Sequence, residues 1–249
     1  MTTNTHKIRV IVNGAHGRMG QETVKAIQDD PAFSLVAQLD HHDDLAKKIH
    51  ETKADVVIDF TTPTAVYKNA RIIIEANVHP VIGTTGLSAQ QIAELQELSQ
   101  GKKIGGIIAP NFSIGAVLLM KYAAETARYF PHVEIIELHH DAKKDAPSGT
   151  ALKTAEMIAE NRREIPKDKT EQEILPGSRG GIKNDIHIHS VRLPGFVAHE
   201  EVIFGGNNET LTLRHDSIHR SAFMPGVILA CKKVMELDSL VYGLEKLLF

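Results

Sequence analysis

Short apolar runs alternate with helix-period segments through the first half of this 249-residue chain. Such runs are typical of strands that a parallel sheet buries on both faces. They predict strands at Ile8–Val12, Ser34–Leu39, Asp55–Phe60, His79–Ile82 and Lys103–Ala109. Helices are predicted between them over Gly17–Gln28, from Thr62-Pro63 to about Ala76, and from Ser88 to Gly101. Thr62 and Ser88 are expected to cap their helices, Ser88 in a capping box with Gln91, and Gly101 to end the last one.

The pattern changes after Asn111, where strands begin to follow one another. Helices are predicted at Ile114–Ala127, Gly149–Arg162 and Phe223–Leu237, and strands at Val133–His139, Ile182–Leu193, Glu200–Phe204 and Thr210–Arg214. The Gly205–Asn208 cluster joins the last two strands as a hairpin turn. The polar stretch Arg163–Gly181 is predicted to be a long surface loop. Successive strands favour a mixed or antiparallel sheet, and therefore a second domain.

The predicted fold is α/β, with an N-terminal Rossmann-like doubly wound parallel sheet and a second α+β domain. Repeated strand–helix–strand units require right-handed crossovers and a parallel sheet. The helix Phe223–Leu237 is expected to pack back on the first domain. The division is therefore predicted as 1–112 with 219–249 for dinucleotide binding, and 113–218 for substrate binding and oligomerisation.

Composition excludes several other classes of protein. The net charge is −3 without a long run of one sign, which argues against a nucleic-acid or membrane-surface partner. The single cysteine, Cys231, cannot form an internal disulfide and lies in an apolar stretch, as a buried thiol would. No signal-peptide-like or 18-residue apolar run occurs, so a cytoplasmic location is expected.

Glycine-bearing turns follow several of the predicted strands of the first domain. The first, Gly14–Gly20, has the spacing G-x-x-G-x-x-G between a strand and a helix, where backbone N–H groups can receive a diphosphate. Asp40 ends the second strand 20 residues later, as the ribose-binding carboxylate of a dinucleotide site does. The turns Gly83–Gly86 and Ala109–Phe112 are expected at the same sheet edge. These features predict an NADH or NADPH site.

The segment Glu137–Thr150 concentrates the groups that could carry chemistry. It contains two histidines and two lysines, and it leads into a helix capped by Ser148, Gly149 and Thr150. The N–H groups and dipole of such a helix start suit a substrate carboxylate, and the cationic side chains are potential proton donors. From residue types alone, a charged loop followed by an ordinary helix cap explains the segment equally well.

The whole chain resembles the 4-hydroxy-tetrahydrodipicolinate reductases. The stretch 134–140 together with Lys143, Asp145 and 147–151 is similar to the signature of that family. The turns Gly14–Gly20, Gly83–Gly86 and Ala109–Phe112 and the triplet 190–192 also resemble it, in the same order.

The resemblance implies a small dicarboxylate substrate, a cyclic imine reduced with NADH or NADPH on the diaminopimelate route to lysine. It implies that His139 donates or accepts a proton, that Lys143 donates one, and that His140, Gly149 and Thr150 bind the substrate carboxylates. It also implies a homotetramer joined through the sheet of the second domain. The dinucleotide-binding residues it implies are Gly14, Ala15, His16, Gly17, Arg18, Met19, Asp40, Gly83, Thr84, Thr85, Ala109, Pro110, Asn111 and Phe112.

Some positions depart from the family pattern, and other functions stay open. His41 stands where many relatives have a basic residue, so the choice between NADH and NADPH is undecided. The segments His41–Lys53 and Leu193–His199 also differ, the first in length and the second in its glycines.

Two other functions stay open: a dehydrogenase of amino or hydroxy acids, and a nucleotide-sensing regulator without catalysis. His187 and His189 share a strand face but have no further zinc-ligand motif, so we expect no metal site.

Overall fold

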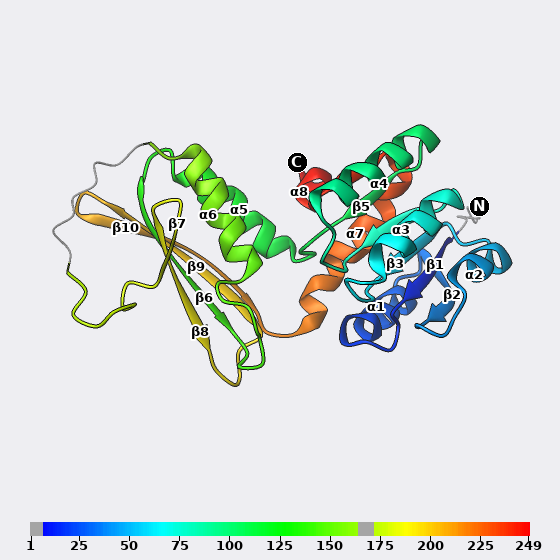
Figure 1. The fold of residues 1–249 in the computed structure, drawn as a ribbon, viewed down its shortest axis with the longest axis horizontal. Helices are drawn as coiled ribbons and strands as arrows, with labels where there is room; N and C mark the ends of the chain where they lie inside the picture. The colour runs from blue at the N-terminus through cyan, green and yellow to red at the C-terminus, as the bar shows by residue number, and fades with distance from the viewer. Residues whose placement is uncertain (1–6, 164–171) are drawn as a thin grey trace. The chain divides into compact units, whose positions relative to one another are not determined.

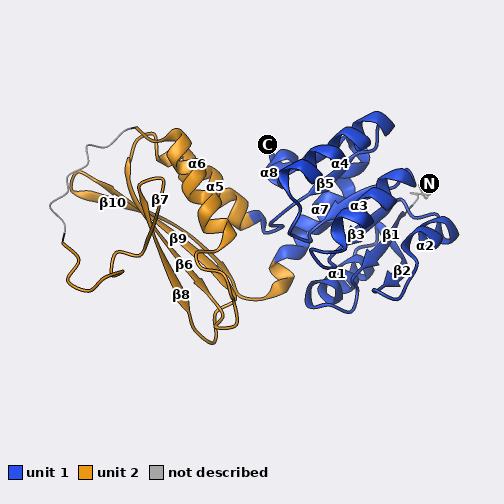
Figure 2. Cartoon of the chain, in the orientation of Figure 1, with its two compact units in different colours: residues 1–114, 223–249 blue, residues 115–222 orange. Residues whose placement is uncertain are grey.

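The chain forms two compact units, drawn in different colours in Figure 2: Met1–Ile114 with Phe223–Phe249, and Gly115–Ala222. The computed structural model describes residues 7–163 and 172–249 of them. The chain passes from the first unit to the second after Ile114 and returns to the first after Ala222. The predicted boundaries, after residues 112 and 218, lie two and four residues before these points. The binding roles assigned to the two domains stay predictions.

The first unit contains a six-stranded, fully parallel sheet in the order β11-β5-β4-β3-β1-β2. Its strands are β1 (Ile8–Asn13), β2 (Phe33–Leu39), β3 (Val56–Asp59), β4 (His79–Ile82), β5 (Gly106–Ile108) and β11 (Leu240–Tyr242). The chain leaves β1 toward β2 and then continues on the other side with β3, so the strand order reverses beside β1. In doubly wound sheets, ligands bind at the carboxyl edge of this reversal point.

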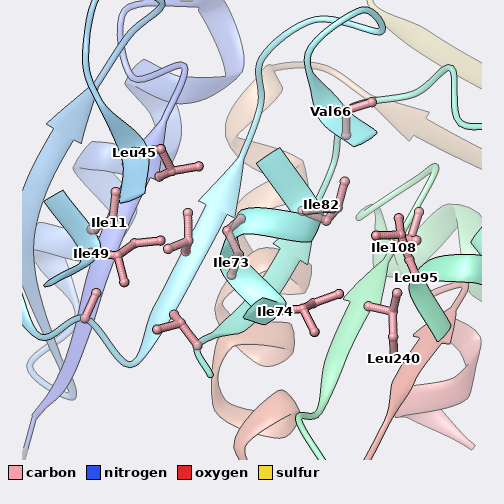
Figure 3. Close-up of a cluster of buried hydrophobic side chains, with 14 of the residues drawn as sticks. Ile11, Leu45, Ile49, Val66, Ile73, Ile74, Ile82, Leu95, Ile108 and Leu240 are labelled. Carbon is pink, nitrogen blue, oxygen red and sulfur yellow. The ribbon is translucent and has the colours of Figure 1, made fainter. Parts of the chain in front are cut away.

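Helices cover the first sheet, as Figure 1 shows. They are α1 (Arg18–Asp29), α2 (Leu45–Thr52), α3 (Val66–Glu75), α4 (Ala89–Lys102), α7 (Met224–Lys233) and α8 (Glu245–Leu248). Helices α2, α3 and α4 share one apolar cluster with the sheet, in which Ile11, Ile82 and Ile108 meet Leu45, Ile74 and Leu95 (Figure 3). Burying such side chains contributes roughly 1.5–3 kcal/mol each and fixes the strand ends that carry the site.

The second unit contains a five-stranded mixed sheet in the order β10-β9-β6-β8-β7. The strands are β6 (His132–His139), β7 (Gly181–Lys183), β8 (Ile186–Arg192), β9 (Ala198–Gly206) and β10 (Glu209–Ser217). Only β6 and β8 pair in parallel. Helices α5 (Ile114–Thr126) and α6 (Gly149–Asn161) lie against one face of the sheet (Figure 1), and their apolar side chains pack on Ile135, Val202 and Phe204.

The predicted fold class is confirmed, and most predicted elements occur within a few residues of their expected bounds. The strand His79–Ile82, the capping box of Ser88 with Gln91, and the cap of α6 at Ser148 are confirmed. The C-terminal helix α7 belongs to the first unit, as expected, where Lys232 forms an ion pair with Asp30 at 2.8 Å.

Several predicted details are wrong. Thr62 does not cap α3, because its carbonyl accepts from Ala65 N in a turn and the helix begins only at Val66. Gly101 lies inside α4, which ends where Lys103 takes a left-handed conformation. The strand predicted over Ile182–Leu193 is a hairpin, because Asn184 and Asp185 both have positive φ and turn the chain.

The remaining differences concern length and short elements. The helix predicted over Phe223–Leu237 is α7 flanked by the short 3₁₀ helices 220–223 and 234–236, and α2, β11 and α8 were not predicted. Part of the loop predicted over Arg163–Gly181, residues 164–171, lies outside the described residues. Within 7–163 and 172–249, no helix combines the length and the apolar character needed to cross a bilayer.

Candidate active site

The first turn of the candidate dinucleotide site lies at the strand reversal. Gly14 follows β1 with φ of +81°, and a Cβ there would lie 2.3 Å from the Phe60 carbonyl oxygen. The N–H groups of Gly14 and Ala15 both donate to the Leu39 carbonyl, at 2.9 and 3.0 Å. The turn is therefore fixed between the ends of β2 and β3, in a conformation that only glycine adopts without strain.

The N-terminus of α1 fits a diphosphate. Its first N–H groups have no acceptor within the helix. Gly17 precedes the helix with an extended backbone and has no side chain to cap it. By contrast, Asp44, Ser88 and Ser148 cap α2, α4 and α6 with side-chain oxygens. The start of α1 therefore keeps donors and a positive dipole end for an anion.

A buried carboxylate connects three of the turns at this edge. Asp59 ends β3 with no exposed surface. It accepts hydrogen bonds from Asn13 (3.0 Å), Asn69 (2.9 Å) and Thr84 (2.7 Å), and also from the hydroxyl of Thr61 (2.7 Å). One side chain thus ties the end of β1, the turn after β3, helix α3 and the turn after β4 together.

Asp40 lies at the end of β2 among three histidines. Its Oδ1 accepts from His42 N at 2.8 Å, and His16 Nε2 lies 4.0 Å from its Oδ2. The rings of His41 and His42 are 3.8 Å apart. The hydrogen bond from His42 N, followed by the charges of the three histidines, lowers the pKa of Asp40 below its ordinary value. Asp40 is therefore ionised at neutral pH and can accept from a ribose diol.

The two later turns also meet at this edge. Thr84, Thr85 and Pro110 line one small pocket, together with Tyr242 of the unpredicted strand β11. Ala109 N donates to Ile82 O at 2.9 Å, which fixes the second turn beside the first. The ring of Phe112 packs edge-on against Phe60, with centroids 5.9 Å apart. The predicted dinucleotide residues thus follow the carboxyl ends of β1, β2, β4 and β5.

The second unit brings the predicted proton-transfer residues close to the start of a helix. His139 ends β6, and Lys143 lies in the loop that leads to α6. Ser148 caps α6 by accepting from Ala151 N at 3.2 Å, so Gly149 and Thr150 are the first two residues of the helix. The side chains of His139 and Lys143 are 14% and 21% exposed, enough for a small molecule to reach them.

A fully buried carboxylate, not predicted from the sequence, holds His139. Glu137 accepts from His139 Nδ1 at 2.5 Å and from both terminal nitrogens of Arg192, at 2.8 and 2.7 Å. Burial raises the pKa of Glu137, but the hydrogen bonds from His139, Arg192 and Ser190 outweigh it and bring the pKa to about 2. Glu137 is therefore a carboxylate throughout the neutral range.

Arg192 extends the network to the second predicted proton donor. Its Nη2 donates to the carbonyl oxygen of Asp145 at 2.8 Å. The carboxylate of Asp145 in turn accepts from Lys143 Nζ at 2.8 and 2.9 Å, and this lowers the pKa of Asp145. His139 and Lys143 thus belong to one continuous network through Glu137, Arg192 and Asp145.

Another buried acid, Glu200, lies opposite Glu137 on β9. Its side chain is covered by α6, where Thr154 hydrogen-bonds to it. Burial raises the pKa of Glu200, the Thr154 hydrogen bond lowers it and the charge of Glu137 raises it, and together they bring the pKa to about 7. Glu200 is therefore largely protonated below neutral pH, and Glu137 carries the negative charge of the pair.

A simple signal in the sequence could have identified Glu137. Residues two apart on a strand share a face, so Glu137 had to lie beside His139. Arg192 lies in the triplet 190–192 that carries part of the resemblance, but its contact with Glu137, like the position of Glu200, follows only from the register of β6 with β8 and β9. The histidine pair is explained by other contacts, since His187 hydrogen-bonds to Arg179 O and His189 to Glu134. Among residues 7–163 and 172–249 there is no group of three ligands arranged to hold a metal ion.

These features together define the class of protein: a two-domain oxidoreductase that combines a Rossmann-like unit with a mixed-sheet unit carrying histidine and lysine side chains beside a helix N-terminus. The family models for the N-terminus and C-terminus of dihydrodipicolinate reductase match residues 8–112 and 115–248. The chain belongs to the dihydrodipicolinate reductase family.

Individual relatives agree with the family match. The chain is 57% identical over 241 residues to a 4-hydroxy-tetrahydrodipicolinate reductase of Coxiella burnetii, covering 97% of this chain and 99% of that protein. It is 54% identical to the Legionella pneumophila reductase, covering 97% of this chain and all of that protein. A dipicolinate-bound dihydrodipicolinate reductase from Paenisporosarcina sp. TG-14 superposes with a TM-score of 0.90 at 46% identity, covering 97% and 99% of the two chains. The chain is therefore an enzyme of this family, which decides against a regulator without catalysis.

Proposed function

We propose that the protein reduces 4-hydroxy-tetrahydrodipicolinate to tetrahydrodipicolinate with a nicotinamide cofactor, on the diaminopimelate route to lysine. The observation that carries this proposal is the network that holds His139 and Lys143 close to the start of α6. Full-length similarity to reductases of that name supports the reaction.

The carboxyl edge of the first sheet would hold the cofactor, which supplies a hydride when it is bound. The uncapped start of α1 and the Gly14–Met19 turn would bind the diphosphate, because their N–H groups are available to an anion. The carboxylate of Asp40 would accept from the ribose hydroxyls. The turns Gly83–Thr85 and Ala109–Phe112 would line the remainder of the site.

Both NADH and NADPH are proposed cofactors. The ionised Asp40 favours the free diol of NADH, because it would repel a 2′-phosphate. The imidazoles of His16, His41 and His42 beside it offer hydrogen bonds, and positive charge when protonated, to that phosphate.

The N-terminus of α6 would bind the substrate carboxylates. The N–H groups of Gly149 and Thr150 lie in the first turn, where the helix dipole favours an anion. His140, next to His139, would contribute a further hydrogen bond. Fixing a dicarboxylate in this way lowers the entropic barrier to reaction.

His139 and Lys143 would manage the protons. Loss of the 4-hydroxyl group as water, together with a proton from the ring carbon between C4 and the imine carbon, would give the conjugated imine. The hydride would then add at C4 and a proton at that neighbouring carbon, so the departing oxygen and the reduced ring must each receive a proton. Lys143 would donate a proton and His139 would donate or accept one, each within reach of the substrate held at α6. Donors positioned where charge develops lower the barrier by a few kcal/mol.

We further propose a cytoplasmic homotetramer joined through the sheet of the second unit. The face of this sheet away from α5 and α6 carries partly exposed side chains, among them Ile182, which is 67% exposed. Light scattering would give four chains per particle, and a monomer at working concentrations would contradict the assembly.

The reaction is tested with enzymatically generated 4-hydroxy-tetrahydrodipicolinate. We expect substrate-dependent oxidation of NADH or NADPH by the purified full chain. Lys143→Ala should abolish most of this activity. The matched control is Lys144→Ala, which removes the neighbouring exposed lysine and should leave the rate within about twofold. No oxidation with either cofactor would refute the proposal.

A further inference from the structure

The contacts of His139 define which of its ring nitrogens can exchange a proton with a ligand. Glu137 lies two residues earlier on β6, on the same face, and has no exposed surface. Its Oε2 lies 2.5 Å from His139 Nδ1. Because the carboxylate is ionised at neutral pH and has no hydrogen to give, Nδ1 must be the donor in this contact. In the neutral ring, Nε2 is then the nitrogen that carries the lone pair.

We propose that Glu137 is a positioning residue for the reduction, which holds His139 as the Nδ1–H tautomer and presents Nε2 to the substrate. This inference rests on the proposed role of His139 in proton transfer. Glu137 acts through the imidazole and does not itself touch the substrate.

Three further hydrogen bonds hold the carboxylate in place, so the imidazole aligns with the carboxylate. Arg192 binds both of its oxygens, and Ser148 N donates to Oε1 at 3.2 Å. Ser148 is also the cap of α6. The same carboxylate therefore sets the direction of the His139 ring and anchors the start of the helix proposed to bind the substrate.

The same strand provides a matched control on its opposite face. Glu134 also contacts a histidine and an arginine: His189 Nε2 lies 2.7 Å away, and Arg179 binds both carboxylate oxygens. Glu134 lies away from His139, with its side chain 35% exposed. Glu134→Gln thus removes a comparable carboxylate from the strand without touching the imidazole proposed to react.

The first test measures the tautomer directly in the wild-type full chain. Proton-coupled ¹⁵N NMR of histidine-labelled protein, with the His139 signals assigned from a His139→Gln spectrum, distinguishes protonated from unprotonated ring nitrogens. We expect the hydrogen of neutral His139 on Nδ1. A hydrogen on Nε2 would overturn the proposal without requiring any variant of Glu137.

The second test separates positioning from a merely structural role. Glu137→Gln should lower kcat by ~10–10²-fold, part of the ~10²–10⁴-fold that acid–base catalysis contributes, with KM within about threefold. In a His139→Ala background the same substitution should cost less than about threefold, because the residue it positions is gone. Glu134→Gln, shown by light scattering to keep the wild-type assembly, should leave kcat within about twofold.

The outcomes discriminate between the two proposals. If Glu137→Gln folds and keeps wild-type kcat, or costs the same factor with and without His139, Glu137 is not a positioning residue. If Glu137→Gln does not fold, Glu137→Asp, which keeps the charge, must retain the Nδ1–H tautomer and more than a tenth of kcat for the proposal to stand. Wild-type activity of His139→Ala alone would instead refute the proposed role of His139.

Discussion

The buried acid Glu200 gives a quantitative test of the electrostatics beneath the candidate active site. The residue is 5% exposed, and its Oε1 has no hydrogen-bond partner among the described residues. Its pKa is raised to about 7 from an ordinary value of 4.5, mainly by burial. Glu200→Gln replaces this acid with a neutral side chain of the same shape, so we expect the variant to lose the pH dependence that ionisation creates.

The size and sign of the effect follow from the two pKa values. Between pH 4.5 and about 7 the folded chain binds a proton at Glu200 that the unfolded chain has released, so folding stability falls as pH rises through this window. The difference of about 2.5 pKa units, at about 1.4 kcal/mol each, corresponds to ~3 kcal/mol. Above pH 7 the folded and unfolded chains have both released this proton, so the loss of folding stability stays constant. Relative to the wild type, the folding stability of Glu200→Gln should therefore rise by up to ~3 kcal/mol between pH 5 and pH 8.

Urea unfolding of the full chain, followed by circular dichroism at equal protein concentrations, measures this gain. The measured quantity is the free energy of unfolding of the variant minus that of the wild type at each pH. The contributions of the other titrating groups are common to both proteins and cancel in this difference. Glu201→Gln is the matched control, because the neighbouring carboxylate pairs with Arg214 at 2.8 Å on the other face of β9. A stability difference for Glu200→Gln that is the same at pH 5 and pH 8 would refute the buried-acid interpretation.

Three further predictions concern the two proposed ligand sites. Lys143→Ala should lower kcat by ~10²–10⁴-fold, the range for a lost acid or base, in steady-state assays, and a loss under threefold would contradict its role. Asp40→Asn should raise KM for NADH by about tenfold or more, because hydrogen bonds to a charged group are lost, and KM for NADPH much less; equal changes would argue against ribose binding. Asp59→Asn should lower the urea-derived stability by ~2–3 kcal/mol, since an amide cannot accept all the hydrogen bonds that now converge on Asp59, and an unchanged stability would exclude its proposed linking role.

The parts of the fold that the sequence predicts well are those with a strong local pattern. Strand β4 is a short apolar run, and Ser88 has its capping partner three residues away, so both are visible without tertiary information. Helix α2 has only two buried apolar residues, Leu45 and Ile49, which is too weak a stripe to recognise. Strand β11 is three residues long and exists because it pairs with β5, more than 130 residues earlier in the chain.

The residues of the candidate site likewise fall into those that a local motif reveals and those that only the fold reveals. The glycine turn, Asp40 and the segment containing His139 and Lys143 are visible as local motifs. Their partners are not, because Arg192 reaches Glu137 only through the parallel register of β6 and β8. The carboxylate of Asp59 likewise collects donors from four segments of the chain. A motif thus points to the candidate reacting groups, whereas the fold determines which side chains contact them.

Isotope transfer tests the proposed reductase most directly. NADH singly deuterated at C4 of the nicotinamide, supplied as each of its two stereoisomers in turn, would be incubated with the full chain and 4-hydroxy-tetrahydrodipicolinate. Mass spectrometry of the product should show one deuterium in tetrahydrodipicolinate from one of the two stereoisomers. A product free of deuterium with both stereoisomers would contradict hydride transfer to the imine by this protein.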